Sequence, residues 1–286
     1  MQQVMPHFSA RLANFQHLVA PRGYTSFIIL TDDNCRALCL PKLLRTNPWL
    51  QDALILEIPA GEGYKNLDTC SHLWQSLFEH RIDRNALLIN LGGGVVTDMG
   101  GFVAAAYKRG MAFINIPTTL LAQVDASVGG KTGIDFGEVK NGIGFFKHPE
   151  SVIISTDLLK TLPTKHWYAG YAELLKHALL AGGDFWKAVE QIKAPNSEQI
   201  LPLLERAVQF KLEVVQQDPQ EKGYRKILNF GHTVGHALES ALLAAEEPLL
   251  HGHAVALGMM AELWLSNKYA DLNGHDYESS LALLKL

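Results

Sequence analysis

The segment KILNFGHTVGHALES, residues 226–240, places His232 and His236 four residues apart beside two glycines. Residues at this spacing share one face of a helix, so the two imidazoles could bind one metal ion. The HExxH zinc motif pairs its histidines in this way but places a glutamate between them, whereas Thr233 and Val234 follow His232 here. Three interpretations stay open: a shared metal, a division between metal and substrate, and packing in the protein interior.

Further potential metal ligands occur in two other helix-like segments of the same half of the chain. The segment AGYAELLKH places Glu173 and Lys176 on one helix face, and His177 lies four residues after Glu173. The segment HGHAV carries His251 and His253, of which only one can face a given point if the segment is helical. A catalytic zinc ion takes three protein ligands and keeps one open position. The sequence alone allows several such sets.

A glycine-rich segment in the first half has the layout of a phosphate-binding loop. The apolar run ALLINL, residues 86–91, predicts a buried strand that leads directly into GGG and then into a helix-like segment. Glycine lets the backbone approach a pyrophosphate, and the N-terminus of a helix offers N–H groups to it. The spacing is neither GxGxxG nor a P-loop, so a tight turn without a ligand explains the glycines equally well. Asp98 either caps the helix or orients a cofactor.

A second candidate segment is IPTTLLAQVDASVGGKTGID, residues 116–135. Thr118 and Thr119 offer hydroxyl groups just beyond a predicted strand, where α/β proteins bind ligands. Lys131, Lys140 and Asn141 follow in a glycine-rich loop region. Their proximity in the sequence favours an anion-binding site.

The elements that must position these residues change in character along the chain. Short apolar runs alternate with helical patterns up to Pro163, which predicts a parallel sheet in an α/β domain. Helical patterns dominate after that residue. We therefore predict an α/β domain at residues 1–162 and an all-α domain at residues 163–286. The predicted strands are 26–30, 53–59, 86–91, 112–117 and 151–155, and helices are predicted at 67–81 and 98–110.

Composition argues against several classes of protein. Lys and Arg number 25 against 29 Asp and Glu, so the chain lacks the basic excess of a nucleic-acid-binding protein. No apolar run approaches the length of a membrane span, and the start MQQVMPHFSARLANF lacks the apolar core of a signal peptide. Cys35, Cys39 and Cys70 lack CxxC spacing and fit reduced thiols. We expect a cytoplasmic protein with a small-molecule ligand.

Six segments resemble, in order, the sequence blocks of the 3-dehydroquinate synthase family. They are GGGVVTDMGGFVAAAYKRG, IPTTLLAQVDASVGGKTGID, KNGIGFFKHP, TLPTKHWYAGYAELLK, KLEVVQQDPQEKGYRKILNFGHTVGHALE and HGHAVALGM. The resemblance extends from TDDN, residues 31–34, to GMMAE, residues 258–262, which is most of the chain. No single block is decisive, but the ordered set is highly specific.

The resemblance implies an N-terminal Rossmann-like domain that binds NAD and a C-terminal helical domain that binds a metal. It places zinc or cobalt on Glu173, His232 and His251, and one carboxylate with two imidazoles suits either ion. It turns His236 toward the substrate and excludes His177 as a ligand.

The resemblance also implies a set of residues that bind the cofactor and a set that binds the substrate. The NAD-binding residues would be Asp32, Asn34, Glu62, Lys65, Gly93, Gly94, Asp98, Thr118, Thr119, Lys140 and Thr161. The substrate-binding and catalytic residues would be Asp125, Lys131, Asn141, Lys176, Lys211, Arg225, Asn229 and His236. Arg109 would reach the site of a neighbouring subunit, which implies a homodimer.

The implied substrate is 3-deoxy-D-arabino-heptulosonate 7-phosphate, a phosphorylated keto acid whose anionic groups suit lysine and arginine. The metal would lower the pKa of the hydroxyl to be oxidised, and NAD+ would take up a hydride and later return it. Phosphate is eliminated between these two steps, and an intramolecular aldol reaction closes the ring of 3-dehydroquinate. The resemblance thus implies a carbon–oxygen lyase of the shikimate pathway, which uses NAD without net oxidation.

The chain departs from the family pattern at three places. His253 stands where the family carries glutamate, and Lys165 and His166 stand where an Arg–Glu pair is usual. The family also continues beyond the position of Leu286 with further helices and a lysine that helps bind the substrate carboxylate. These 286 residues hold no counterpart of that lysine. We therefore expect Lys211 to be the main cation for the carboxylate, and we expect poor turnover.

Three other functions stay open. A sister sugar-phosphate cyclase of the 2-deoxy-scyllo-inosose or valiolone type would share the fold, NAD and the metal. A related polyol or glycerol-phosphate dehydrogenase would release NADH instead of recycling it. A catalytically inactive binding module would bind NAD and zinc without turnover. The anion-binding residues favour dehydroquinate synthase among these.

Overall fold

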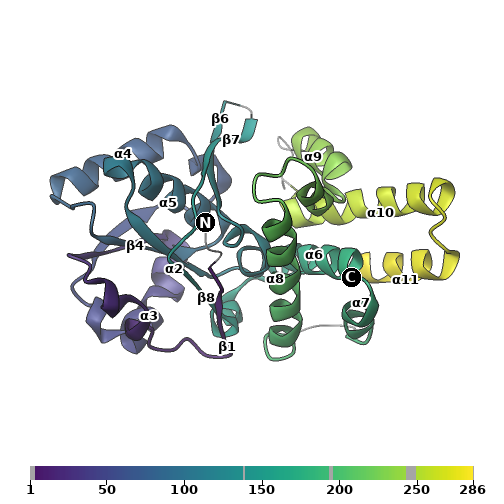
Figure 1. Ribbon diagram of the computed structural model, residues 1–286, viewed down its shortest axis with the longest axis horizontal. Helices are drawn as coiled ribbons and strands as arrows, with labels where there is room; N and C mark the ends of the chain where they lie inside the picture. The colour runs from purple at the N-terminus through teal and green to yellow at the C-terminus, as the bar shows by residue number, and fades with distance from the viewer. Residues whose placement is uncertain (1–3, 138, 193–195, 243–248, 286) are drawn as a thin grey trace. The chain divides into compact units, whose positions relative to one another are not determined.

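The computed structural model describes residues 4–137, 139–192, 196–242 and 249–285. Contacts within the chain divide it into two compact units, Met1–Thr161 and Leu162–Leu286. The sequence placed the division one residue later, between 162 and 163. In Figure 1 the first unit runs from purple to teal and the second ends in yellow.

The first unit is built on a six-stranded sheet with the order β1-β8-β5-β4-β2-β3, in which every adjacent pair is parallel. Runs of Ile and Leu form the inner strands because such residues fill both buried faces of a parallel sheet. The predicted α/β fold is confirmed, and β1 is a strand that the sequence did not predict. The strands are β1 (His7–Ser9), β2 (Phe27–Asp32), β3 (Leu54–Ile58), β4 (Leu87–Gly92), β5 (Ala112–Pro117) and β8 (Ser151–Ser155).

The strand order creates a switch point between β2 and β4. The chain passes from β2 outward to β3 and then returns to form β4 on the other side of β2. Connections that leave two adjacent strands in opposite directions open a crevice outside their carboxyl ends, and ligands of α/β proteins bind there. Taken without β1, the order matches the flavodoxin-like variant of the doubly wound sheet.

Helices cover both faces of this sheet (Figure 1). The helices α4 (Leu67–Glu79) and α5 (Gly94–Ala106) pack on the face that includes Ile28 and Leu88. The helices α2 (Asp33–Leu38) and α3 (Leu40–Thr46) pack on the face that includes Ile29 and Ile89. Shorter elements of this unit are α1 (Gln16–Val19), η1 (Ala20–Arg22), η2 (Pro48–Leu50), η3 (Glu62–Tyr64), η4 (Tyr107–Arg109), η5 (Ala122–Ala126) and η6 (Thr156–Thr161).

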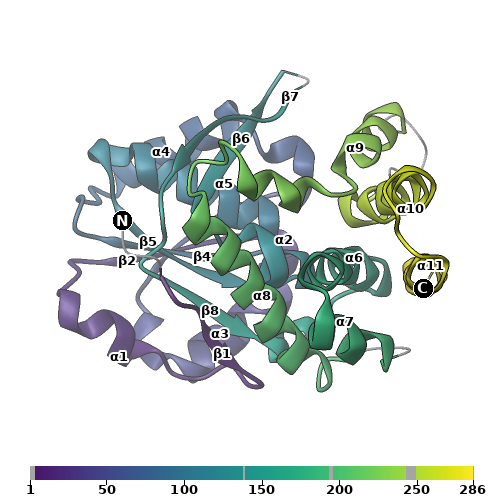
Figure 2. The same ribbon diagram turned by 45° about the vertical axis from the view of Figure 1, so that its right-hand side comes forward.

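A β-hairpin stands where the sequence predicted a glycine-rich loop (Figure 2). Its strands, β6 (Lys131–Phe136) and β7 (Val139–Phe146), are antiparallel and form a separate two-stranded sheet. All residues of β7 are exposed. Because neither face of the strand is buried, its sequence VKNGIGFF lacks the alternation of apolar and polar residues that predicts a strand. Glycine permits the close pairing, since a Cβ on Gly144 would lie 2.2 Å from the backbone oxygen of Thr132.

The second unit is helical, as predicted, and its described residues include no strand. Its elements are α6 (Thr164–Ala181), α7 (Gly183–Glu190), α8 (Ile200–Gln217), η7 (Tyr224–Asn229), α9 (His232–Ala241), α10 (His251–Tyr269) and α11 (Gly274–Leu284). Within the described parts of the chain, no helix is both long enough and apolar enough to cross a membrane.

Helix α10 packs against α6 and α9 with their backbones in direct contact. A Cβ built on Gly252 would lie 1.8 Å from the backbone oxygen of Ala169 in α6, and one on Gly258 would lie 1.9 Å from the backbone oxygen of Gly231. Gly231 immediately precedes α9 and has a φ of +81°, a conformation that costs glycine little. These glycines bring the start of α10 close to α6 and to the start of α9.

Replacing Gly258 with alanine should destabilise the helical unit, because the new Cβ would meet backbone atoms that cannot turn aside. Overpacking of this kind costs about 1–3 kcal/mol, which urea unfolding followed by circular dichroism would measure. The matched control is Gly274→Ala in α11, where nothing lies within 4 Å of the new Cβ. The control should stay within about 0.5 kcal/mol of the wild-type protein. Equal stabilities for the two variants would show that α10 is not held by this contact.

Candidate functional site

Three potential metal ligands of the helical unit point toward one another. Glu173 lies on α6 and is fully buried, and His232 and His251 are the first residues of α9 and α10. The Nε2 atoms of His232 and His251 lie 3.7 and 3.6 Å from the same oxygen, Oε1 of Glu173. In a tetrahedral zinc site with bonds of about 2.0–2.1 Å, ligand atoms lie about 3.3–3.4 Å apart. These three side chains therefore fit a divalent ion after small shifts.

The second ring nitrogen, Nδ1, of both His232 and His251 also has a hydrogen-bond partner. Nδ1 of His232 lies 3.2 Å from the backbone oxygen of Phe230, and Nδ1 of His251 lies 3.3 Å from Oε2 of Glu239. Because both partners accept hydrogen bonds, each Nδ1 carries a hydrogen and donates it. The lone pair of the neutral ring then lies on Nε2, the atom that faces Glu173, as a metal ligand requires.

The two rings differ in charge. Burial, together with the ammonium group of Lys176, lowers the pKa of His232 to about 4, so this ring is neutral at pH 7. Burial also acts to lower the pKa of His251, but hydrogen bonds to Glu173 and Glu239 outweigh it and raise the pKa to about 9. His251 is therefore an imidazolium between two carboxylates when no ion is bound. Metal binding at this ring must release a proton.

Lys176 lies beside Glu173 on the same face of α6. Its Nζ is 2.5 Å from Oε2 of Glu173, and both side chains are almost completely buried. The sequence assigned Lys176 to the substrate, whereas the structure places its ammonium group on the carboxylate that faces the two histidines. A contact between Lys176 and the substrate stays a prediction.

His236 creates a second possible ligand set. It lies one turn after His232 on α9 and is exposed. Its ring centroid is 5.1 Å from that of His232 and 5.6 Å from that of His251, and one nitrogen from each of the three rings lies within 4.8 Å of the others. The structure therefore brings together the sequence-predicted set and a set in which His236 takes the place of Glu173.

Two of the three places at which the chain departs from the family pattern, Lys165–His166 and His253, lie close together. Burial, followed by the charges of Lys165 and His253, lowers the pKa of His166. The ring of His253 in turn forms a hydrogen bond with the backbone of Lys165, which acts against the effect of burial on its pKa. The unusual residues of α6 and α10 are thus neighbours rather than isolated changes.

Three other residues that the sequence assigned to the substrate lie on α8 and η7. Lys211 and Arg225 are buried, and the guanidinium of Arg225 donates to the backbone oxygen of Pro219 at 3.0 Å. The amide of Asn229 donates to Oε1 of Glu221 at 3.1 Å. Their contacts with a substrate stay predictions.

In the first unit the glycine segment connects β4 to α5. Strand β4 ends at Gly92 and helix α5 begins at Gly94. A Cβ on Gly92 would lie 2.5 Å from the side chain of Val96, and one on Gly93 would lie 3.1 Å from Cγ2 of Thr119. The first N–H groups of α5 have no partner within the helix and lie at the positive end of its dipole. The glycines therefore permit the tight turn from β4 into α5, and the N–H groups at the start of α5 are suited to a pyrophosphate.

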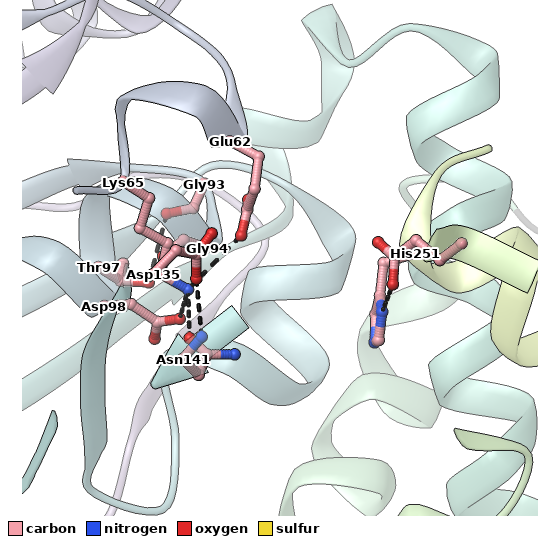
Figure 3. A network of polar contacts seen from close by, with 10 residues as sticks. Glu62, Lys65, Gly93, Gly94, Thr97, Asp98, Asp135, Asn141 and His251 are labelled. Atoms are coloured by element: carbon pink, nitrogen blue, oxygen red, sulfur yellow. Dashed lines mark hydrogen bonds and ion pairs between the residues drawn. The ribbon is translucent and has the colours of Figure 1, made fainter. Parts of the chain in front are cut away.

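Lys65 joins three other predicted residues beside this loop (Figure 3). It is buried, and its Nζ donates to Oδ2 of Asp98 at 2.7 Å and to Oδ1 of Asn141 at 2.6 Å. Oε1 of Glu62 lies 3.8 Å from the same nitrogen. Burial alone would lower the pKa of Lys65, but Asp98 and Glu62 outweigh it and raise the pKa above its ordinary value. The ammonium group therefore stays charged inside the protein.

Asp135 completes this network, although the sequence analysis did not single it out. Its backbone N–H donates to the backbone oxygen of Lys65 at 2.8 Å, and its carboxylate accepts from the backbone N–H of Asn141 at 2.7 Å (Figure 3). Asn141 has a φ of +51°, which asparagine tolerates better than most residues. Asp135 thus holds the backbone of β7 at Asn141, the residue whose side chain contacts Lys65.

The remaining predicted cofactor residues follow the carboxyl ends of the parallel strands, with the exception of Lys140 on the exposed strand β7. Asp32 ends β2 and caps α2 by accepting from the N–H of Cys35 at 2.7 Å. The hydroxyl of Thr118 lies 3.2 Å from the sulfur of Cys35. Because all six strands are parallel, these ends share one edge of the sheet. The other predicted residues at this edge are Asn34 in α2, Thr119 after β5 and Thr161 at the end of η6.

Three further predicted residues of this unit lie on other short elements. Asp125 is part of η5, and Lys131 is the exposed first residue of β6. Arg109 is exposed in a turn where it and Lys108 have φ values of +67° and +46°. Its predicted reach into a neighbouring subunit stays a prediction.

Glu239 is a further buried residue that sequence reasoning missed. It lies seven residues after His232 on α9 and so shares a helix face with it. That spacing was a usable signal, but the contact with His251 depends on the packing of α10.

Comparison with known protein families matches both parts of the chain. Residues 55–169 match the family model described as 3-dehydroquinate synthase N-terminal, and residues 170–286 match 3-dehydroquinate synthase C-terminal. The 3-dehydroquinate synthase of Parabacteroides distasonis is 44% identical over 258 residues, which cover 90% of this chain and 73% of that protein. Other curated relatives that carry this name are 39–48% identical, and the chain spans 57–79% of their length.

Two solved structures share the fold closely. A 2-deoxy-scyllo-inosose synthase complexed with carbaglucose-6-phosphate, NAD+ and Co2+ has a TM-score of 0.86 and 26% identity, over 99% of this chain and 81% of that one. The 2-epi-5-epi-valiolone synthase ValA of Streptomyces hygroscopicus subsp. jinggangensis, with NAD+ and Zn2+ bound, has a TM-score of 0.85 and 28% identity, over 100% of this chain and 82% of that one.

The iron-containing alcohol dehydrogenase of Thermococcus thioreducens is 14% identical with a TM-score of 0.69 and shares the fold alone.

The family models and the curated relatives agree with each other, and the resemblance seen in the sequence is confirmed. This chain belongs to the 3-dehydroquinate synthase family.

Proposed function

We propose that this protein converts 3-deoxy-D-arabino-heptulosonate 7-phosphate to 3-dehydroquinate and phosphate. The observation that carries the proposal is the geometry of the helical unit, where two imidazole nitrogens face one buried carboxylate oxygen at 3.6 and 3.7 Å. Family membership supplies the reaction to which such a metal site contributes.

The proposed metal ligands are Glu173, His232 and His251. We favour Glu173 over His236 as the third ligand because its buried carboxylate supplies a negative charge, whereas His236 is exposed and neutral as a ligand. Zinc and cobalt both suit this set, and the two related cyclase structures contain Co2+ and Zn2+.

The proposed cofactor is NAD, held at the carboxyl edge of the parallel sheet. The glycine connection between β4 and α5 would bind its pyrophosphate through backbone N–H groups. Lys65 and Asp98 would position the cofactor from the charged network beside that connection. NAD+ is present in both related cyclase structures.

The bound metal and NAD+ would supply acidification of a substrate hydroxyl and uptake of a hydride, respectively. The residues of the chain would bind and orient the substrate. Lys211 and Arg225 are buried cations suited to its phosphate and carboxylate. His236 is exposed beside the two ligand histidines, where its imidazole would accept or donate a proton.

A sister sugar-phosphate cyclase is the second candidate, because the two closely similar structures are of that kind. The identity of 44% to a 3-dehydroquinate synthase, against 26–28% to these cyclases, favours the first candidate. The homodimer with Arg109 at a neighbour's site and the cytoplasmic location stay predictions.

The proposed activity is tested by supplying the heptulosonate phosphate with NAD+ and Zn2+ or Co2+ and measuring phosphate and NADH together. Phosphate should be released while NADH absorbance does not accumulate, because the hydride returns to the substrate. Accumulation of NADH in step with product would indicate a dehydrogenase. Absence of phosphate release from the heptulosonate phosphate, together with tight binding of carbaglucose-6-phosphate, would indicate a cyclase of the inosose type instead.

Replacing His232 with alanine should abolish both metal binding and turnover, because Nε2 of His232 is a proposed ligand. Replacing His236 with alanine should abolish turnover but retain the metal. The metal content of each purified variant, measured after dialysis against Zn2+ at equal protein concentration, checks the difference. Equal loss of metal in both variants would place His236 among the ligands and overturn this division of roles.

Replacing Lys65 with methionine should weaken NAD+ binding, because Asp98 and Asn141 lose the ammonium group that holds them. Loss of one charge-assisted hydrogen bond costs about 1.5–3 kcal/mol, so the Kd should rise about 10- to 150-fold. Isothermal titration calorimetry would measure the Kd for NAD+. Lys187→Met, at an exposed lysine of α7, is the charge-matched control and should bind NAD+ normally. A normal Kd for the Lys65 variant would remove this network from the cofactor site.

A further inference from the structure

Glu239 is a buried carboxylate that the proposed reaction does not use. It lies on α9 with 7% of its surface exposed. Its Oε2 is 3.3 Å from Nδ1 of His251, on the side of that ring opposite to the atom that faces Glu173. Burying a carboxylate is costly without a partner, so the position of Glu239 calls for a role.

The two proposed ligand histidines are held in different ways. Nδ1 of His232 donates to the backbone oxygen of Phe230, two residues earlier in the chain. Nδ1 of His251 donates to a side chain on a different helix. The orientation of His232 is therefore built into the turn before α9, whereas the orientation of His251 depends on Glu239.

A carboxylate behind a ligand histidine acts on the metal in two ways. It accepts the hydrogen of Nδ1, which leaves the lone pair on Nε2, and its negative charge makes that nitrogen a better donor. Lys176 already offsets the charge of Glu173 through its contact at 2.5 Å. Glu239 therefore adds a negative charge next to the site that balances the charge of a divalent ion.

We propose that Glu239 is a positioning residue that holds His251 with Nε2 turned toward the metal and strengthens this nitrogen as a ligand. The inference rests on the proposed metal site and extends it to a residue that does not touch the ion. It assigns to α9 two roles, since this helix would supply one ligand directly and fix another that lies on α10.

The test compares metal affinity among variants of the whole chain, by competition for Zn2+ or Co2+ with a chelator of known affinity. In Glu239→Gln the amide oxygen can still accept from Nδ1, but the charge is lost. In Glu239→Ala both are lost. Removing such a partner weakens metal binding about 10- to 100-fold, and we expect the alanine variant to lose more than the glutamine variant. The visible spectrum of the cobalt-loaded protein should also change, because the geometry at the ion changes.

The matched control is Glu262→Gln on α10. Glu262 accepts a hydrogen bond from the backbone N–H of Gly231 at 2.9 Å and so holds the start of α9. Within the described part of the chain it forms no hydrogen bond with either ligand ring. Its glutamine variant keeps an acceptor and should bind metal as the wild-type protein does. Circular dichroism and NAD+ affinity should be unchanged in all variants.

Each outcome separates the two proposals. Wild-type affinity in both Glu239 variants would overturn the positioning role and leave the metal site standing. Equal weakening in the Glu262 control would also overturn it, because loss of a carboxylate charge elsewhere between α9 and α10 would then have the same effect. Failure of the wild-type protein to bind either ion would overturn the metal site itself and this inference with it.

Discussion

The histidine site depends on how closely the backbone of α10 approaches α6 and the turn that begins α9. A Cβ at Gly252 or Gly258 would lie within 2 Å of a backbone oxygen of the neighbouring helix or turn. Packed helices have axes about 8–10 Å apart, depending on the side chains at the contact, and glycine permits the short end of that range. His251 then begins α10 beside Glu173, and His232 begins α9 close to the same carboxylate oxygen. Without this approach the three proposed ligands, which lie on three different helices, would be too far apart to bind one ion.

In the first unit the corresponding constraint is the direction of the strands. Parallel strands bring every carboxyl end to one edge, so residues from 32 to 119 can line a single cofactor site. The hairpin adds a side chain that no strand of the main sheet supplies, because Asn141 accepts a hydrogen bond from Lys65. A charge network thus links the glycine connection, the segment after β3 and the hairpin.

Much of the fold could be predicted from hydrophobic patterning. The inner strands are short, largely apolar runs, and each predicted strand is present. The bounds of β5 and β8 are as predicted, and those of β2, β3 and β4 differ by one or two residues. The hairpin could not be predicted in this way because β7 is exposed along its whole length. Its strand structure comes from pairing with β6 and from glycines that permit it, and neither leaves a periodic signal.

The residues of the candidate site were harder to predict from hydrophobic patterning than the fold was. The spacing of His232 and His236 suggested a shared metal, and only the family resemblance pointed to Glu173 in place of His236. Glu173 and Lys176 are buried on α6, which packs against α8 and α10, two helices that are distant from it in the sequence. Glu239 escaped prediction for the same reason, since its helix-face position was visible but its partner on α10 was not. Residue types predicted which chemistry is available, whereas the packing determines which groups meet.

The central claim is that Glu173, and not His236, is the third metal ligand. Anomalous diffraction at the zinc absorption edge, from crystals of the zinc-loaded protein, would locate the ion directly. The account predicts one peak bonded to an oxygen of Glu173 and to Nε2 of both His232 and His251, at about 2.0–2.2 Å, with His236 outside bonding distance. A peak bonded to His236 and not to Glu173 would contradict it.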